Sequence, residues 1–129
     1  NYSSGTVVSG GTLQLGSATA NTSGLGSGSV TLTNSGVLNL FAAGAEDLGT
    51  GGAGGPFSNP LVVPAGASGS FGIPFRFTVS STLTGAGTLN LGVTGVRGDF
   101  SGNWSGFTGT INITSLDGTS DFRCNNSAG

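Results

Sequence analysis

Hydrophobic and polar residues alternate in several short stretches of the chain, most clearly in residues 28–41, GSVTLTNSGVLNLF. Every second residue on either side of the central Asn-Ser-Gly is aliphatic, which gives one apolar face to each half: Val30, Leu32, Leu38 and Leu40. Alternation with a period of two is typical of half-buried β-strands. Because Asn and Gly tolerate the φ angles of tight turns, this stretch predicts two short strands joined by a turn.

The same alternation predicts short strands elsewhere, at residues 6–8, 12–15, 61–63, 82–84, 87–92, 109–114 and 121–124. In the aromatic stretch at residues 70–80, Phe75, Phe77 and Val79 share one face. Residues 17–27 are predicted to form a polar loop in which Leu25 is the one large apolar residue. Residues 42–59 are predicted to form a long loop rich in Gly and Ala. Residues 93–108 are predicted to be rich in turns, with three large packing groups: Phe100, Trp104 and Phe107.

A pentapeptide of the form Gly-(Thr/Ser/Val)-aliphatic-polar-aliphatic recurs along the chain, starting at Gly11, Gly28, Gly36, Gly87 and Gly109. Internal repeats of this kind are typical of solenoids, in which each coil stacks on the next. No segment has the spacing and caps of a helix. We therefore predict an all-β fold, a right-handed parallel β-helix of five or six coils with roughly 20–25 residues each. A β-sandwich is the alternative, since it also combines short strands with frequent turns.

Stacked coils should place like residues above like. We expect one outward ladder of threonines and one of amides, formed by Thr12, Thr88 and Thr110 and by Gln14, Asn90 and Asn112. Residues 1–129 are interpreted as a single β-solenoid module, either a segment of a longer chain or a stacking subunit. Bare strand edges at its ends would pair with flanking coils of the same chain or with copies of itself.

Composition narrows the classes of function. Gly, Ser and Thr make up 61 of the 129 residues, and only 6% are charged, against roughly 25% in an ordinary domain. Patterned apolar residues with so little charge indicate an ordered protein whose surface consists of hydroxyls and amides. The net charge is −2 and lysine is absent, so there is no basic patch for a nucleic-acid partner. No apolar run is long enough to span a membrane.

Two stretches, GTVVSGGTLQLG and LGSGSVTLTNSGVLNL within residues 5–41, resemble the passenger-associated β-strand repeat of bacterial autotransporters and related surface proteins. STLTGAGTLNLG, within residues 80–92, resembles the later part of that repeat, and residues 98–114 resemble segments of other large secreted bacterial β-helices. The resemblance implies a secreted or surface-displayed parallel β-helix that serves as a stalk, adhesin or matrix element. It implies no catalytic residues.

Residues able to catalyse a reaction or bind a metal are few. Histidine and lysine are absent, which removes Ser-His-Asp and lysine-based nucleophiles. The carboxylates are Glu46, Asp47, Asp99, Asp117 and Asp121. Only the first two are adjacent, and we interpret them as a solvated loop tip. Asp99 with Asp117 or Asp121 is the weaker alternative, as a catalytic pair. We therefore expect that the chain is not an enzyme and that it binds no metal and no cofactor.

Two short features have both a functional and a structural interpretation. Arg97-Gly98-Asp99 matches a tripeptide that animal integrins bind, but three residues coincide easily, and we interpret them as a turn with a local ion pair. Cys124 is the only cysteine, so it cannot form an internal disulfide. It is interpreted as a small structural thiol, with an intermolecular bridge as the alternative.

The sequence offers candidate sites both for an attached glycan and for a bound one. Asn-x-Ser/Thr sequons, which are candidates for N-glycosylation, begin at Asn1, Asn21, Asn103, Asn112 and Asn125. Trp104 is a candidate contact for a bound glycan, and core packing is its structural alternative. The Thr-x-Thr pairs Thr31/Thr33 and Thr82/Thr84 could face ice.

These observations together predict an extracellular structural module of a bacterial surface protein, a stalk, adhesin or fibre subunit that assembles end to end into filaments. A β-solenoid with a glycan-binding or ice-binding surface is the alternative. The expected partners are copies of the chain, flanking coils and surface glycans.

Overall fold

The computed structural model describes residues 3–16, 24–40, 47–48, 56–73, 76–94, 97–115 and 118–124. Regular structure in these residues is entirely β, with 13 strands and no helix. Every pair of neighbouring strands runs in the same direction. The prediction of a parallel β-helix is confirmed, and the β-sandwich is excluded because its strands pair antiparallel.

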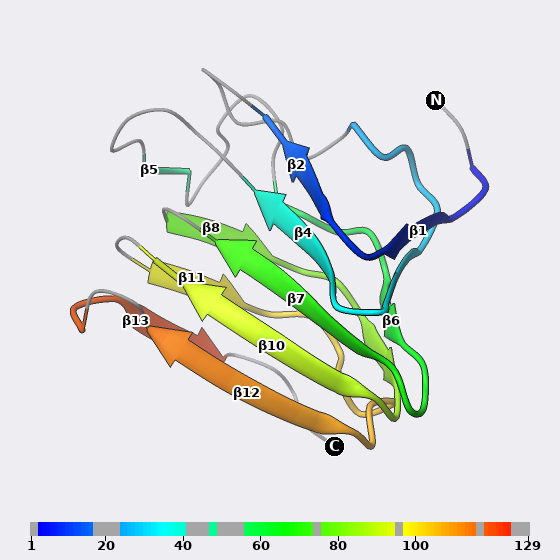
Figure 1. Ribbon diagram of the computed structural model, residues 1–129. Coiled ribbons are helices and arrows are strands. Elements are labelled where there is room, and N and C mark those ends of the chain that lie inside the picture. Colours follow the sequence, from blue (N-terminus) through cyan, green and yellow to red (C-terminus); the bar gives the residue numbers. More distant parts are fainter. Residues whose placement is uncertain are drawn as a thin grey trace.

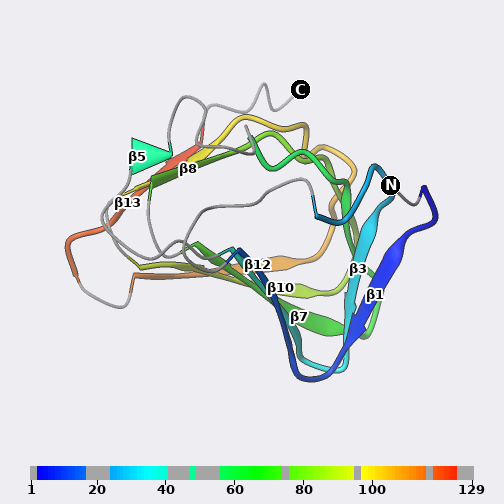
Figure 2. The same cartoon turned by 90° about the horizontal axis from the view of Figure 1, so that it is seen from above.

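Three parallel sheets form the sides of the solenoid (Figures 1 and 2). Sheet A contains β1 (Thr6–Ser9), β3 (Val30–Thr33), β6 (Leu61–Val63) and β9 (Leu83–Gly85). Sheet B contains β2 (Thr12–Leu15), β4 (Gly36–Leu40), β7 (Ser68–Ile73), β10 (Thr88–Val93) and β12 (Thr110–Ser115). Sheet C contains β5 (Asp47–Leu48), β8 (Arg76–Val79), β11 (Arg97–Phe100) and β13 (Asp121–Cys124).

The coil is right-handed, as predicted. In Figure 1 the chain crosses the front in sheet B from right to left, returns behind it in sheet C, and descends from the N-terminus to the C-terminus. It makes about four turns, not the predicted five or six, because the coils are unequal. Hydrogen-bonded neighbours in successive coils are 21 residues apart at Gly69 and Asn90, but 33 apart at Ser35 and Ser68. The longer coil contains residues 42–59.

The core lies inside the tube. Successive inward side chains stack on one another, and the following are at most 2% exposed: Val30, Leu32, Leu38, Leu40, Phe57, Leu61, Val63, Phe71, Ile73, Phe77, Val79, Leu83, Leu89, Leu91, Val93 and Phe100. Each such side chain stabilises the fold by about 1.5–3 kcal/mol relative to an exposed one. Leu25 is buried too, as expected. The buried Asn59 fastens the segment before β3 to the next coil, donating from Nδ2 to the carbonyl oxygens of Gly26 (3.0 Å) and Gly28 (2.8 Å).

The Asn-Ser-Gly turn is a corner of the tube. Asn34 and Ser35 have φ angles of 48° and 60°, and the strands on either side, β3 and β4, lie in sheets A and B and do not pair with each other. Gly36 follows the turn, and a Cβ at this position would collide with the carbonyl oxygen of Val8. Close contact between coils therefore requires glycine here.

Like pentapeptides do stack, but in two separate pairs. β2 pairs with β4 so that Leu13 lies above Leu38, and β10 pairs with β12 so that Leu89 lies above Ile111. Between these pairs runs β7, which lacks the motif. Leu38 of β4 pairs with Phe71 of β7, and Phe71 pairs with Leu91 of β10. Leu38 therefore shares a row with Leu91 and not with Leu89, its equivalent in the pentapeptide, so the two motif pairs are offset by two residues.

Because of this offset, the predicted ladders of threonines and of amides are only partly right. Thr88 does lie above Thr110 and Asn90 above Asn112, but Thr12 and Gln14 belong to other rows. β7, β10 and β12 have six residues each, against four in β2. The first two residues of each longer strand precede the residue that aligns with the start of β2. A shift of two residues keeps every side chain on its own face of the sheet.

Two predicted loops contain short strands. Asp47–Leu48 forms β5 within residues 42–59, and Phe57 makes an isolated parallel bridge with Val79. The predicted turn at Arg97–Asp99 is wrong, because these residues belong to β11. Gly98 faces the core there, and a Cβ would meet the ring of Phe100 at 2.7 Å. Phe75 and Glu46 lie outside the described residues.

Two glycine substitutions test the stacking. Neither Gly36 nor Gly92 has a positive φ, yet a Cβ at Gly36 meets the Val8 backbone and a Cβ at Gly92 meets no atom within 4 Å. We expect Gly36→Ala to lower the free energy of unfolding by about 3 kcal/mol. Gly92→Ala should raise it by about 0.5 kcal/mol through lost chain entropy. Urea denaturation measures both, and equal effects would contradict the coil-to-coil contact.

Candidate functional site

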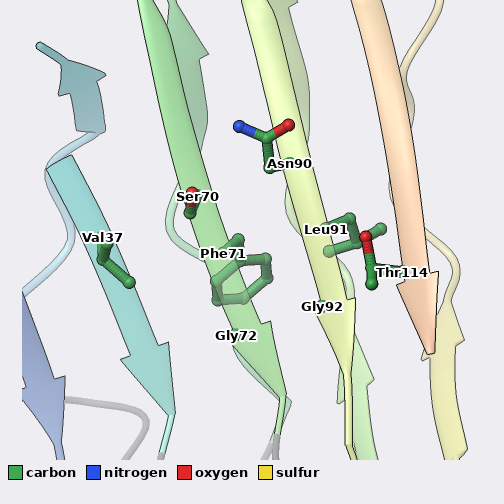
Figure 3. A pocket seen from close by; sticks show the side chains of 8 residues that line it. All are labelled: Val37, Ser70, Phe71, Gly72, Asn90, Leu91, Gly92 and Thr114. Carbon is green, nitrogen blue, oxygen red and sulfur yellow. The ribbon is translucent and has the colours of Figure 1, made fainter. Parts of the chain in front are cut away.

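A shallow hollow of about 220 Å³ lies on the outer face of sheet B. It forms because Gly72 of β7 and Gly92 of β10 are paired neighbours in an outward row and neither has a side chain. Figure 3 shows Val37, Ser70 and Asn90 along one side, on three adjacent strands. Thr114 of β12, which pairs with Gly92, closes the row below.

The two glycines differ in how open they are. Asn39 of β4 pairs with Gly72, and its Oδ1 occupies the place that a Cβ on Gly72 would take. Gly92 has open space above it. The backbone at Gly92 is therefore the bare floor of the hollow, and a hydroxyl from Thr114 and an amide from Asn90 stand at its rim. The sequence signal for this hollow is the glycine at matching positions of FGI and LGV, and no prediction from the sequence included it.

An amide ladder runs beside the hollow. Asn112 donates from Nδ2 to Oδ1 of Asn90 over 3.0 Å, and Asn90 donates to the carbonyl oxygen of Gly69 over a longer 3.5 Å. The outer face of sheet B has no charged residue in the described part of the chain. The groups it offers to a ligand are hydroxyls, amides, peptide backbone and the aliphatic side chain of Val37.

Charge collects on the outer face of sheet C instead. All three arginines of the chain are on its strands, Arg76 on β8, Arg97 on β11 and Arg123 on β13. Arg97 binds Asp99 on the same strand, Nε to Oδ2, at 2.7 Å, and Arg123 binds Asp121 at 2.9 Å. The predicted ion pair at Arg97 is therefore confirmed, in a strand and not in a turn.

The two ion pairs face each other in opposite order. β11 and β13 pair so that Arg97 lies above Asp121 and Asp99 above Arg123, and each charge thus has an opposite charge along its strand and across the sheet. This checkerboard favours one register of β13, because a two-residue slip would bring like charges together. In the sequence this arrangement is visible as Arg-Gly-Asp on one strand and the opposite order of charges, Asp-Phe-Arg, on the next.

Most of the carboxylates considered as catalytic or metal-binding candidates either form ion pairs or lie outside the described residues. Asp99 and Asp121 each bind an arginine on the outer surface, and Glu46 and Asp117 lie outside the described residues. No cluster of three or more metal-ligating side chains occurs within the described ranges. Cys124 is a free, exposed thiol at the end of β13.

Trp104 packs into an aromatic cluster. Its indole Nε1 donates to the carbonyl oxygen of Ser81 at 3.1 Å, and its ring meets Phe100 edge-on at 5.3 Å between centroids. The ring of Phe122 also stacks on the ring of Phe100, with 4.7 Å between the two centroids. Trp104 and Phe107 are half-buried against the core, so the prediction of large packing groups is confirmed. The candidate role of Trp104 in glycan contact stays a prediction.

Two of the five sequons can be placed. Asn103 is exposed, and its Oδ1 accepts a hydrogen bond from the backbone N–H of Ser105 at 2.9 Å. Asn112 is exposed as well, but its Nδ2 is the donor to Asn90. Because a glycan is attached through Nδ2, Asn103 is the better placed acceptor. Asn1, Asn21 and Asn125 lie outside the described residues.

The threonine pairs do not make one regular array. On the outer face of sheet A, Thr31 pairs with Val7 above and Val62 below, and Val62 pairs with Thr84. Thr33 and Thr82 lie outside this row. Threonine therefore alternates with valine along the sheet, and the row presents methyl groups as often as hydroxyls.

Comparisons with known proteins find no matching family, no related curated protein and no similar solved structure. In the described residues, no helix is long and apolar enough to cross a membrane.

Exchanging Asp121 and Arg123 tests the checkerboard. The double variant Asp121→Arg/Arg123→Asp keeps the pair within β13 but places like charges opposite Arg97 and Asp99. These side chains are about half exposed, and solvent screens them, so we expect the free energy of unfolding to fall by only about 0.5 kcal/mol. The loss should vanish near 1 M salt, where the Debye length is about 3 Å.

A matched control reverses all four charges. With Arg97→Asp and Asp99→Arg added to the double variant, opposite charges face each other again and stability should return. Thermal unfolding at low and high salt measures each variant. A quadruple variant as unstable as the double one would show that the cross-strand contacts have no effect.

Proposed function

We propose that the chain is an extracellular structural module of a bacterial surface protein, a stalk, adhesin or fibre subunit. The observation that carries this proposal is the stacking of like pentapeptides in register, Leu13 on Leu38 and Leu89 on Ile111. Such stacking produces a tube whose length depends on the number of coils and whose core continues from one coil to the next.

The surface chemistry supports an extracellular location. In the described residues, the outer faces of sheets A and B carry hydroxyls, amides and valine side chains and no charge. The resemblance to autotransporter repeats points to secreted proteins of the same construction. Asn103, exposed and with Nδ2 outside its local hydrogen bond, is proposed as the first site for glycosylation. We propose no catalytic role, since Asp99 and Asp121 are engaged in ion pairs.

A scaffold tolerates the loss of a whole coil. Asn90 and Asn112 occupy equivalent positions 22 residues apart, so deleting residues 88–109 puts Thr110 in the place of Thr88. We expect this variant to fold, with the long axis shorter by about 4.8 Å and a lower melting temperature. Circular dichroism and small-angle X-ray scattering measure the fold and the length.

Deleting half a coil is the matched control. Removal of residues 88–98 joins Gly87 to Asp99 in the middle of β11 and takes β10 out of sheet B. We therefore expect it to unfold the remaining C-terminal part. If the whole-coil variant unfolded as completely as the half-coil variant, the modular structural role would be contradicted.

A binding surface for an uncharged glycan is the second candidate, and the hollow at Gly92 favours it. Its floor is peptide backbone without a side chain, and its rim has a hydroxyl, an amide and the aliphatic Val37. Among the described residues, the strands of sheet B carry no charge. Neutral sugars present apolar C–H faces together with hydroxyl groups, which such a floor and rim can contact.

Filling the hollow separates the two candidates. Gly92→Thr adds a side chain where no atom lies within 4 Å of a Cβ, so we expect the fold to keep its stability while any glycan binding falls at least tenfold. A neutral glycan array and a thermal-hysteresis assay on both proteins provide the readout, with Thr84→Ser on sheet A as the matched control. Silence of the unmodified chain in both assays would reject the binding surface and leave the scaffold.

A further inference from the structure

In the part of the chain that the structure describes, the end of the tube formed by β12 and β13 leaves apolar side chains of the core exposed. β12 and β13 each pair with a strand on one side only in the described residues. Ile113 of β12 points inward, yet it is 52% exposed, whereas Leu91, its neighbour one coil above, is 1% exposed. Phe122 and Ile111 are also only partly buried. An apolar layer and two strand edges thus lie open together, which is the surface that pairs with another strand.

We propose that this end binds the β2 edge of a second copy of the chain, head to tail. The inference rests on the proposed fibre subunit and names its partner. β2 suits the position because it belongs to sheet B, as β12 does, runs in the same direction, and pairs only with β4 in the part of the chain that the structure describes. Adding it beneath β12 extends sheet B by one more parallel strand.

The two strand pairs in which both strands carry the pentapeptide define the proposed register. GTLQL stacks on GVLNL, and GTLNL stacks on GTINI, in both cases with equivalent residues paired. The same rule places Leu13 of the second copy beneath Ile111, Gln14 beneath Asn112 and Leu15 beneath Ile113. Ile111 and Ile113 then each receive an apolar partner.

The amide ladder supports this register. Asn112 uses Nδ2 to bind Asn90 in the coil above, so its Oδ1 is the acceptor for a donor below. In the second copy, Gln14 carries a suitable donor, Nε2, which in the single chain makes a long 3.3 Å bond to the carbonyl oxygen of Gly16. Head-to-tail contacts of this type do not close on themselves, and they produce filaments.

Cysteine cross-linking tests both the partner and the register. In a Cys124→Ser background, Asn112→Cys and Gln14→Cys would be opposite neighbours across the contact, and adjacent strands bring Cα atoms within the roughly 4.4–6.8 Å that a disulfide spans. We expect mild oxidation of the double variant to give a ladder of dimers, trimers and larger species on a non-reducing gel.

Control variants identify the other arrangements. Asn112→Cys with Thr12→Cys reports a register shifted by two residues, and a stronger ladder from this pair would overturn the proposed register. Dimers from Asn112→Cys alone would indicate a tail-to-tail contact, and absence of cross-links in every variant would indicate no contact. Either result would overturn the proposal.

A second measurement avoids engineered cysteines. Ile113→Lys changes a residue already half exposed, so the fold should persist while self-association, followed by sedimentation velocity, weakens at least tenfold. Val7→Lys is the matched control, because Val7 is 66% exposed on the outer face of sheet A and should leave association unchanged. Equal effects of the two variants would overturn the end-face contact.

The two proposals fail separately. A chain that stays monomeric but tolerates the whole-coil deletion retains its role as a scaffold and loses only the stacking. A chain that does not tolerate the deletion loses the scaffold itself, whatever its state of association.

Discussion

Parallel hydrogen bonding between coils is the constraint on which the rest of the structure depends. Each strand is held by the backbone of the strands above and below it, and a residue therefore lies directly over its counterpart in the next coil. An inward position must be apolar in every coil, as Leu38, Phe71 and Leu91 are. An outward position needs a side chain that tolerates a similar neighbour 4.8 Å away, which suits hydroxyls and amides better than charges.

Glycine is the second consequence of the same constraint. At Gly36 and Gly102 the coil above approaches so closely that a Cβ would collide with a carbonyl oxygen. Elsewhere, at Gly92, the coil is no closer than usual and the missing side chain leaves a hollow. One residue type thus has two roles in this chain, and composition alone does not separate them.

The sequence predicted the parts of the fold that depend on periodicity. Alternation located β3, β4, β6 and β10 and placed Val30 and Leu38 in the core. Recurrence of the Gly-initiated pentapeptide favoured a parallel β-helix over a sandwich. Both succeed because local pattern and global stacking require the same residues.

Other features depend on which residues meet in space, and these were missed or displaced. The two-residue offset in sheet B follows from the longer strands β7, β10 and β12, which no single repeat reveals. β11 was predicted as a turn, because Arg-Gly-Asp lacks aliphatic alternation. Its strand geometry comes from the inward Gly98, which leaves room for the ring of Phe100 on the same strand, and from pairing with β8 and β13. Asn59 likewise resembles any loop asparagine until its two carbonyl partners are known.

Within the described ranges, charged residues lie only on the strands of sheet C, which makes this part of the tube electrically one-sided. In the described residues, neither of the other two faces has an ionised side chain to repel a neighbouring tube. Two tubes that approach through sheets A or B meet no local electrostatic barrier, and added salt has little to screen between those faces. A bundle of such tubes would orient its members, with the arginine-bearing sides turned outward to water.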